Sequence, residues 1–206
     1  MTRFPLRAGA AALALIAAPL IAVTAPTLAS AQSAARDSNA EQFVQTEANR
    51  ALQILRQGNA GAERGQFRAF VDQVADVPRI TRFVLGKYAR TISPAQYAQF
   101  ADVFRGYANG VYESRLGQYK GQGLNVTGSI VRKPGDVVVQ SQITGQKAQP
   151  VQWRVVQSGG SWKVVDVNVA GVWLALTQQQ DFVSTLDNNR GDINVLINQL
   201  RSQTGR

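Results

Sequence analysis

The side chains of this sequence that could do chemistry are carboxylates, tyrosines and arginines, because the chain has no histidine and no cysteine. These absences exclude Ser-His-Asp and Cys-His catalysis, histidine-based metal sites and a disulfide framework. The acidic residues show no clustered pair in a clear site context. Asp166 with a tyrosine could serve an isomerase or dehydratase, but it alternates onto the polar face of its strand. We therefore predict a protein that is not an enzyme, with no catalytic residues, metal or cofactor.

Arginines offer the clearest binding chemistry. Arg79, Arg82 and Arg90 fall on one arc of a helix expected over residues 79–90, where they could dock the protein onto an anionic membrane or partner surface. The alternative is an ordinary solvated helix face. Arg115 returns to the apolar stripe of a longer helix. There it could make a forked contact with a phosphate, or interact with the unpaired carbonyl groups at the C-terminal end of its helix.

The N-terminus has the layout of a secretory signal peptide. Arg3 and Arg7 precede an almost wholly apolar stretch over residues 8–25, and Ala29-Ser30-Ala31 supplies small residues for cleavage. We predict cleavage after Ala31 and export to the periplasm; a retained membrane anchor is the alternative. A flexible leader over 32–37 and one domain over 38–206 are then expected.

The remaining chain is basic. The sequence holds 22 basic and 13 acidic residues, and the predicted signal peptide removes two basic residues, which leaves a net charge of 20 − 13 = +7. This balance favours anionic partners. Export and the lack of a basic block with interleaved aromatics argue against nucleic acid.

Hydrophobic periodicity predicts helices around a meander of strands. Helices are expected over residues 38–56, 62–77, 79–90, 94–119, 172–186 and 192–203. Ser38 with Glu41, and Ser93 with Gln96, fit capping boxes at two of the helix starts. Strands are expected over residues 124–132, 137–144, 149–157 and 162–169. Short links make them antiparallel, so the fold class is α+β: a curved sheet of four strands, or slightly more, with helices packed across it. Such a sheet can enclose a cavity.

Several segments together resemble the MlaC family, also called toluene-tolerance auxiliary proteins. The resemblance is carried, in order, by Arg82-Phe83-Val84-Leu85-Gly86-Lys87-Tyr88, Ser93-Pro94, Phe100-x-x-x-Phe104, Trp162-Lys163-Val164-Val165-Asp166-Val167, Gly171-Val172, Phe182, Gly191-Asp192-Ile193 and Leu196-Ile197. Trp173-Leu174-Ala175 and Gln178-Gln179-Gln180 depart from the family pattern. A hopanoid-associated sister group, HpnM, shares the architecture, so a hopanoid or another lipid stays an alternative ligand.

The resemblance implies a periplasmic phospholipid carrier, with a sheet like that of nuclear transport factor 2 and added helices. It also implies partners: an inner-membrane ABC transporter with an MCE-domain ring, and an outer-membrane lipoprotein–porin complex. We expect a monomer. The alternatives from other classes are an enzyme on the same scaffold and a structural adaptor of the transporter.

The candidate lipid-binding residues are apolar side chains of the predicted helices and strands, with Arg115 at the cavity mouth: Phe70, Val74, Phe83, Val84, Phe100, Phe104, Val111, Trp153, Val155, Val165, Val167 and Val169. Burial of one CH₂ group is worth about 0.8 kcal/mol, so an acyl chain of ~16 carbons would cost on the order of 12 kcal/mol to cross water bare. An apolar cavity removes most of that cost.

Overall fold

The computed structural model describes residues 35–56, 60–117, 123–145 and 148–204, and only the backbone of 60–64 and 112–117. The predicted signal peptide and its cleavage site lie outside the described residues. The elements are α1 (Ser38–Arg56), α2 (Ala60–Val74), α3 (Val77–Leu85), the 3₁₀ helix η1 (Gly86–Arg90), α4 (Pro94–Gly117), β1 (Gly123–Lys133), β2 (Asp136–Thr144), β3 (Gln149–Ser158), β4 (Ser161–Val169), β5 (Val172–Trp173), α5 (Leu174–Asn188) and α6 (Ile193–Thr204).

The sheet is an antiparallel meander in the order β1-β2-β3-β4-β5, so the predicted α+β class is confirmed. The short β5 is an addition to the four expected strands. A tight turn with positive φ at Ala170 and Gly171 folds the chain back, and Val172 then pairs with Val169. The helix expected from residue 172 therefore begins two residues later, at Leu174.

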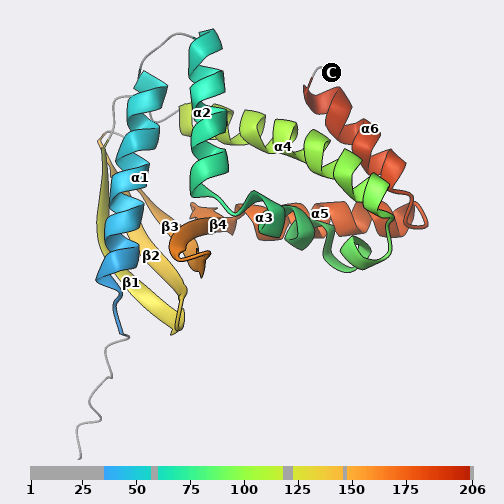
Figure 1. Ribbon diagram of the computed structural model, residues 1–206. Coiled ribbons are helices and arrows are strands. Elements are labelled where there is room, and N and C mark those ends of the chain that lie inside the picture. Colours follow the sequence, from blue (N-terminus) through green and yellow to red (C-terminus); the bar gives the residue numbers. More distant parts are fainter. Residues whose placement is uncertain (1–34, 57–59, 118–122, 146–147, 205–206) are drawn as a thin grey trace, which may run out of the picture. The chain divides into compact units, whose positions relative to one another are not determined.

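One face of the sheet packs against α1 (Figure 1). Val137, Val139 and Val155 have no exposed surface and form a cluster with Ala40 and Val44 of α1. These side chains come from alternate positions of β2 and from the paired position of β3, as a sheet with one covered face requires.

A β-bulge in β4 separates Val165 from Val167, two candidate lipid-binding residues that strict alternation would place on one face. Arg154 pairs with Asp166, whereas the next residue, Val155, pairs with Val164, so Val165 is an extra residue. A bulge shifts the side-chain alternation. As a result Val164 and Val167 both contact the α1 side of the sheet, and Val165 does not share a face with Val167.

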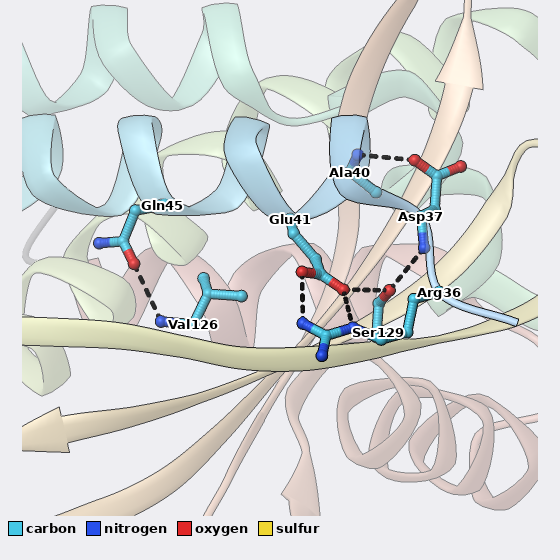
Figure 2. Close-up of polar contacts among 7 residues, drawn as sticks. All are labelled: Arg36, Asp37, Ala40, Glu41, Gln45, Val126 and Ser129. Carbon is cyan, nitrogen blue, oxygen red and sulfur yellow. Dashed lines mark hydrogen bonds and ion pairs between the residues drawn. The ribbon is translucent and has the colours of Figure 1, made fainter. Parts of the chain in front are cut away.

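The start of α1 is fixed to β1 by side-chain hydrogen bonds (Figure 2). The cap is Asp37, not Ser38 as predicted: the Ala40 amide donates to Asp37 Oδ1 at 2.9 Å. The Asp37 amide donates to Ser129 Oγ at 2.8 Å, and Ser129 Oγ donates to Glu41 Oε1 at 2.7 Å. Glu41 thus reaches across to the sheet instead of back to the helix start, because Ser129 lies within its reach.

Gln45 ties the middle of α1 to the same strand. It accepts a hydrogen bond from the Val126 amide at 2.9 Å and donates to the Leu124 carbonyl at 2.8 Å (Figure 2 shows the first). β1 is an edge strand of the sheet, so the backbone groups on its outer side have no strand partner. One amide side chain supplies partners for two of these groups, so α1 cannot easily slide along the sheet.

The helix predicted over residues 79–90 is two elements. Gly86 has a φ of +53° and ends α3, and η1 follows. The predicted capping box of α4 is confirmed: the Ser93 amide donates to Gln96 Oε1 at 2.9 Å, and the Gln96 amide donates to Ser93 Oγ at 3.2 Å.

The helices α3 to α6 share a second core beside the sheet (Figure 1). At its centre Phe100 and Phe104 stack at a centroid distance of 5.6 Å, and Phe182 meets both rings edge-on at 5.9 and 6.0 Å. Among the described residues, none of the helices has the length and apolar character that a membrane span needs.

Candidate functional site

The candidate site is a cavity of about 110 Å³ bounded by α1, α2, α3, α4 and strands β3 and β4. Its walls come from elements far apart in the sequence that the two cores hold in place. Its lining residues are Phe43, Val44, Glu47, Ala48, Ala51, Phe67, Phe70, Val71, Val74, Ala75, Val77, Ile80, Phe104, Arg105, Ala108, Asn109, Trp153, Val164, Asp166 and Val167.

The wall of this cavity is mainly apolar. Only four of the twenty lining residues carry a charged or amide side chain: Glu47, Arg105, Asn109 and Asp166. A surface of this kind gains free energy by contact with hydrocarbon and offers few groups for polar recognition.

A second cavity of about 160 Å³ lies next to the first. The two cavities share a wall made of Ile80, Phe104 and Ala108. The second cavity is more polar, and on its wall the Tyr107 hydroxyl donates to Gln178 Oε1 at 3.0 Å. Residues of α3 and α4 therefore lie between two neighbouring spaces.

The structure brings seven of the predicted apolar residues to these cavities. Phe70, Val74, Trp153 and Val167 line the first, Val84 and Val111 line the second, and Phe104 lines both.

The other five lie elsewhere. Phe100 and Val155 have no exposed surface and fill the two cores, Val165 is the bulge residue of β4, and Val169 packs against the end of the sheet cluster. Phe83 is 36% exposed on α3. Helical or strand spacing can place a side chain on a buried face but cannot tell close packing from a cavity wall.

The three predicted docking arginines are all exposed, but they do not form one helical arc. Arg79 and Arg82 lie one turn apart on α3, whereas Arg90 lies beyond the break at Gly86, at the end of η1. The Arg82 guanidinium stacks over the Tyr97 ring at 5.9 Å. Arg115 belongs to α4, but its side chain lies outside the described residues.

Asp166, the one candidate for carboxylate chemistry, has a structural task. Its Oδ1 accepts hydrogen bonds from the amides of Val167 and Ala175, both at 2.8 Å. The residue before α5, Trp173, provides no side-chain cap, so Asp166 caps this helix from β4. Burial raises the pKa of Asp166, more than these backbone hydrogen bonds lower it. None of the tyrosine hydroxyls in the described part of the chain bonds to it.

Two polar atoms of the first cavity lack hydrogen bonds. Asn109 is 6% exposed, and its Nδ2 has no partner. Glu47 Oε2 also has no hydrogen bond, and it forms an ion pair with Arg50 Nη1 at 3.6 Å. A buried donor left unpaired costs about 1–3 kcal/mol, so such atoms are uncommon without a reason.

Sequence reasoning missed Arg105, Asn109 and Glu47. One signal was present: Arg105 and Asn109 are polar residues four apart, each directly after a residue of the apolar stripe, Phe104 and Ala108. Polar positions bordering a stripe usually face solvent, whereas here the packing of α2 against α4 brings both residues to the cavity wall.

Comparison with known proteins agrees with this architecture. The family model "MlaC protein" matches residues 45–202. The toluene tolerance protein Ttg2D of Pseudomonas putida is 27% identical over 127 residues, which cover 60% of this chain and 59% of that protein. The match thus spans less than two thirds of that relative's length.

A solved structure shares the fold. The phospholipid-binding protein from Ralstonia solanacearum, determined in complex with a phospholipid, superimposes with a TM-score of 0.71 at 24% sequence identity, over 81% of this chain and 97% of that chain. The family model covers most of the described sheet and helices, including every wall of both cavities except the start of α1. On this match, the chain belongs to the MlaC family.

Proposed function

We propose that the protein is a periplasmic carrier that buries the acyl chains of a phospholipid and moves the lipid between outer-membrane and inner-membrane transport complexes. The observation that carries the proposal is the apolar cavity between α1, α2, α4 and the sheet. The phospholipid complex of the Ralstonia protein, which has the same fold, supports the choice of ligand. The family relationship and the signal-like N-terminus support export and the two transport complexes as partners.

The cavities constrain how lipid is loaded. At about 110 and 160 Å³ they are smaller than the roughly 300–1,000 Å³ typical of small-molecule pockets. Acyl chains therefore enter only when the walls move apart, and the side-chain partition between the two cavities is the part that can yield without breaking backbone hydrogen bonds. The Asp166 carboxylate caps the start of α5 through the Ala175 amide, which supports a binding function over a catalytic one.

The test is extraction of natively purified protein with organic solvent, followed by mass spectrometry. The wild type is expected to carry stoichiometric phospholipid from its host. Val167→Trp places an indole in the cavity and should remove most of the bound lipid, at a stability cost within the about 1–3 kcal/mol of an overpacked core. The control is Val138→Trp: Val138 is half-buried and lies between Val137 and Val139 of β2, which pack against α1, so it points to the opposite face.

Repeated preparations without stoichiometric lipid would overturn the carrier proposal. Equal losses of lipid and stability in Val167→Trp would instead mark Val167 as ordinary core. Transfer is tested separately, by following a labelled phospholipid from donor to acceptor vesicles with the loaded protein as the only carrier.

A further inference from the structure

The cavity has a polar spot on α4 that an empty or purely hydrocarbon-filled cavity leaves unused. Arg105 and Asn109 are one helical turn apart and both line the cavity. Asn109 is 6% exposed, and its amide nitrogen has no hydrogen-bond partner. The apolar wall around it offers none.

We propose that Asn109 donates a hydrogen bond to an oxygen at the polar end of the bound acyl lipid, with Arg105 beside it. The inference rests on the proposed lipid-carrying function. It specifies that the polar end of the lipid contacts the α4 wall of the cavity. The shared chemistry is an oxygen acceptor attached close to an acyl chain. In a phospholipid this is either an ester carbonyl or a phosphate oxygen.

Charge places this acceptor on the α4 wall. Across the cavity on α1, Glu47 presents an oxygen that has no hydrogen bond and is ion-paired with Arg50; as an acceptor it has no donor to offer a phosphate or a carbonyl. Arg105 is held by one ion pair, with its Nε 3.5 Å from Asp72 Oδ1, and half of its side chain is exposed. Its guanidinium therefore has donors to spare at the point where the wall meets solvent.

The deep position of Asn109 sets the depth of the lipid. Because Asn109 is buried, its amide would contact the lipid where the acyl chain joins the head group. Arg105 lies one turn closer to the start of α4 and is half exposed, so it would contact a charged group of the lipid nearer to solvent. The apolar lining beyond them is left for the chain itself, which needs no polar partner.

The variant Asn109→Leu tests the proposal, because it replaces an unpaired donor by an apolar side chain of similar size. In lipid-free protein it should leave the unfolding midpoint unchanged or raise it, since no native hydrogen bond is lost. The matched control is Asn168→Leu. Asn168 is equally buried, at 7% exposure, but its Oδ1 accepts from the Gly171 amide at 3.0 Å, so the control should melt lower.

Binding is measured with three defined probes that share chain length: a diester phosphatidylcholine, its diether analogue, and a diacylglycerol. If the ester carbonyl is the acceptor, Asn109→Leu should weaken both ester lipids about tenfold and leave the diether lipid unchanged. If the phosphate is the acceptor, it should weaken both phospholipids by that factor and leave diacylglycerol unchanged.

Unchanged affinity of Asn109→Leu for all three probes would overturn the proposal while the carrier function stands. So would a loss of stability equal to that of Asn168→Leu with binding intact, since the amide would then be structural. Wild-type protein that binds none of the probes would overturn the carrier function and this inference together.

Discussion

Asp166 shows how much one side chain can determine in this fold. It follows the bulge residue Val165 on β4, and its carboxylate binds amides of its own strand and of α5. The carboxylate therefore fixes where the sheet ends and the helix begins. A residue that sequence reasoning weighed as a catalytic acid is explained by this capping role.

The substitution Asp166→Ala should lower the free energy of unfolding by about 1 kcal/mol, the usual cost of losing a helix cap. Asp166→Asn keeps an acceptor oxygen without the charge. Because the folded-state pKa of Asp166 is raised, the wild type loses stability as pH rises from the ordinary carboxyl value of about 4 through that raised pKa. Asp166→Asn should escape this loss and equal or exceed the wild type at pH 7.

Denaturant unfolding at a series of pH values measures both effects, with exposed Asp102→Asn on α4 as the control. If Asp166→Asn is as unstable as Asp166→Ala at neutral pH, the negative charge itself is what α5 requires.

The sequence predicts a contact correctly where the interacting residues are close together in the chain. The capping box at Ser93 and Gln96 needs only residues three apart, and the structure confirms both hydrogen bonds. The predicted N-cap of α1 is wrong by one residue, because Asp and Ser are equally favourable N-cap residues. Ser129, 92 residues away, is hydrogen-bonded to the Asp37 amide, and a single-sequence pattern does not contain that contact.

At the scale of elements, α3 presents the most distinctive outer surface. Arg79, Arg82 and the partly exposed Phe83 lie together on this short helix, whose other side is buried at Ile80 and Val84. Two cations beside an exposed aromatic ring suit contact with an anionic lipid surface.

Reversing both charges, Arg79→Glu with Arg82→Glu, should slow lipid delivery to anionic vesicles on the order of tenfold at low ionic strength, since each cation near such a surface contributes about 1 kcal/mol. Bound lipid should stay in place, because neither residue lines either of the two described cavities. The measurement is the transfer rate across a salt series, which should weaken the difference.

The double reversal Arg68→Glu with Arg190→Glu is the matched control, because both residues are exposed and the total charge change is the same. Equal slowing by both pairs would mean that net charge, not the α3 surface, drives delivery.

The order of helices and strands could be predicted from the sequence, but two local irregularities within them could not. The helix–sheet–helix order and the antiparallel meander followed from periodicity and short links. The break at Gly86 and the bulge at Val165 did not, because side-chain spacing does not show where the backbone departs from regular helix or strand geometry. The bulge decides which valines face the cavity, because strict strand alternation would place Val165 on the same face as Val167.

For the molecule as a whole, the proposed carrier function implies that a buried lipid adds to the stability of the folded state. A ligand that binds only the folded state adds about 2.7 kcal/mol when present at a hundredfold excess over its Kd. Removing lipid should therefore lower the melting temperature by about 5–10 °C for a domain of this size. Adding phospholipid vesicles should restore it.

Differential scanning calorimetry of loaded, delipidated and reloaded protein measures this effect, and Val167→Trp serves as the control because it should respond weakly to lipid. Identical melting curves for loaded and delipidated wild type would show that lipid held by the protein lies outside the folded core.

The partition between the two cavities has a consequence for selectivity. Phe104 stacks on Phe100, meets Phe182 edge-on and lines both spaces, whereas Val111 lines only one. Under the proposed carrier function, changes at Val111 should alter the depth of one compartment, while changes at Phe104 should alter whether the compartments are joined. The length of the acyl chain and the number of acyl chains that the protein accepts should then be two separate traits, which mutation can tune independently.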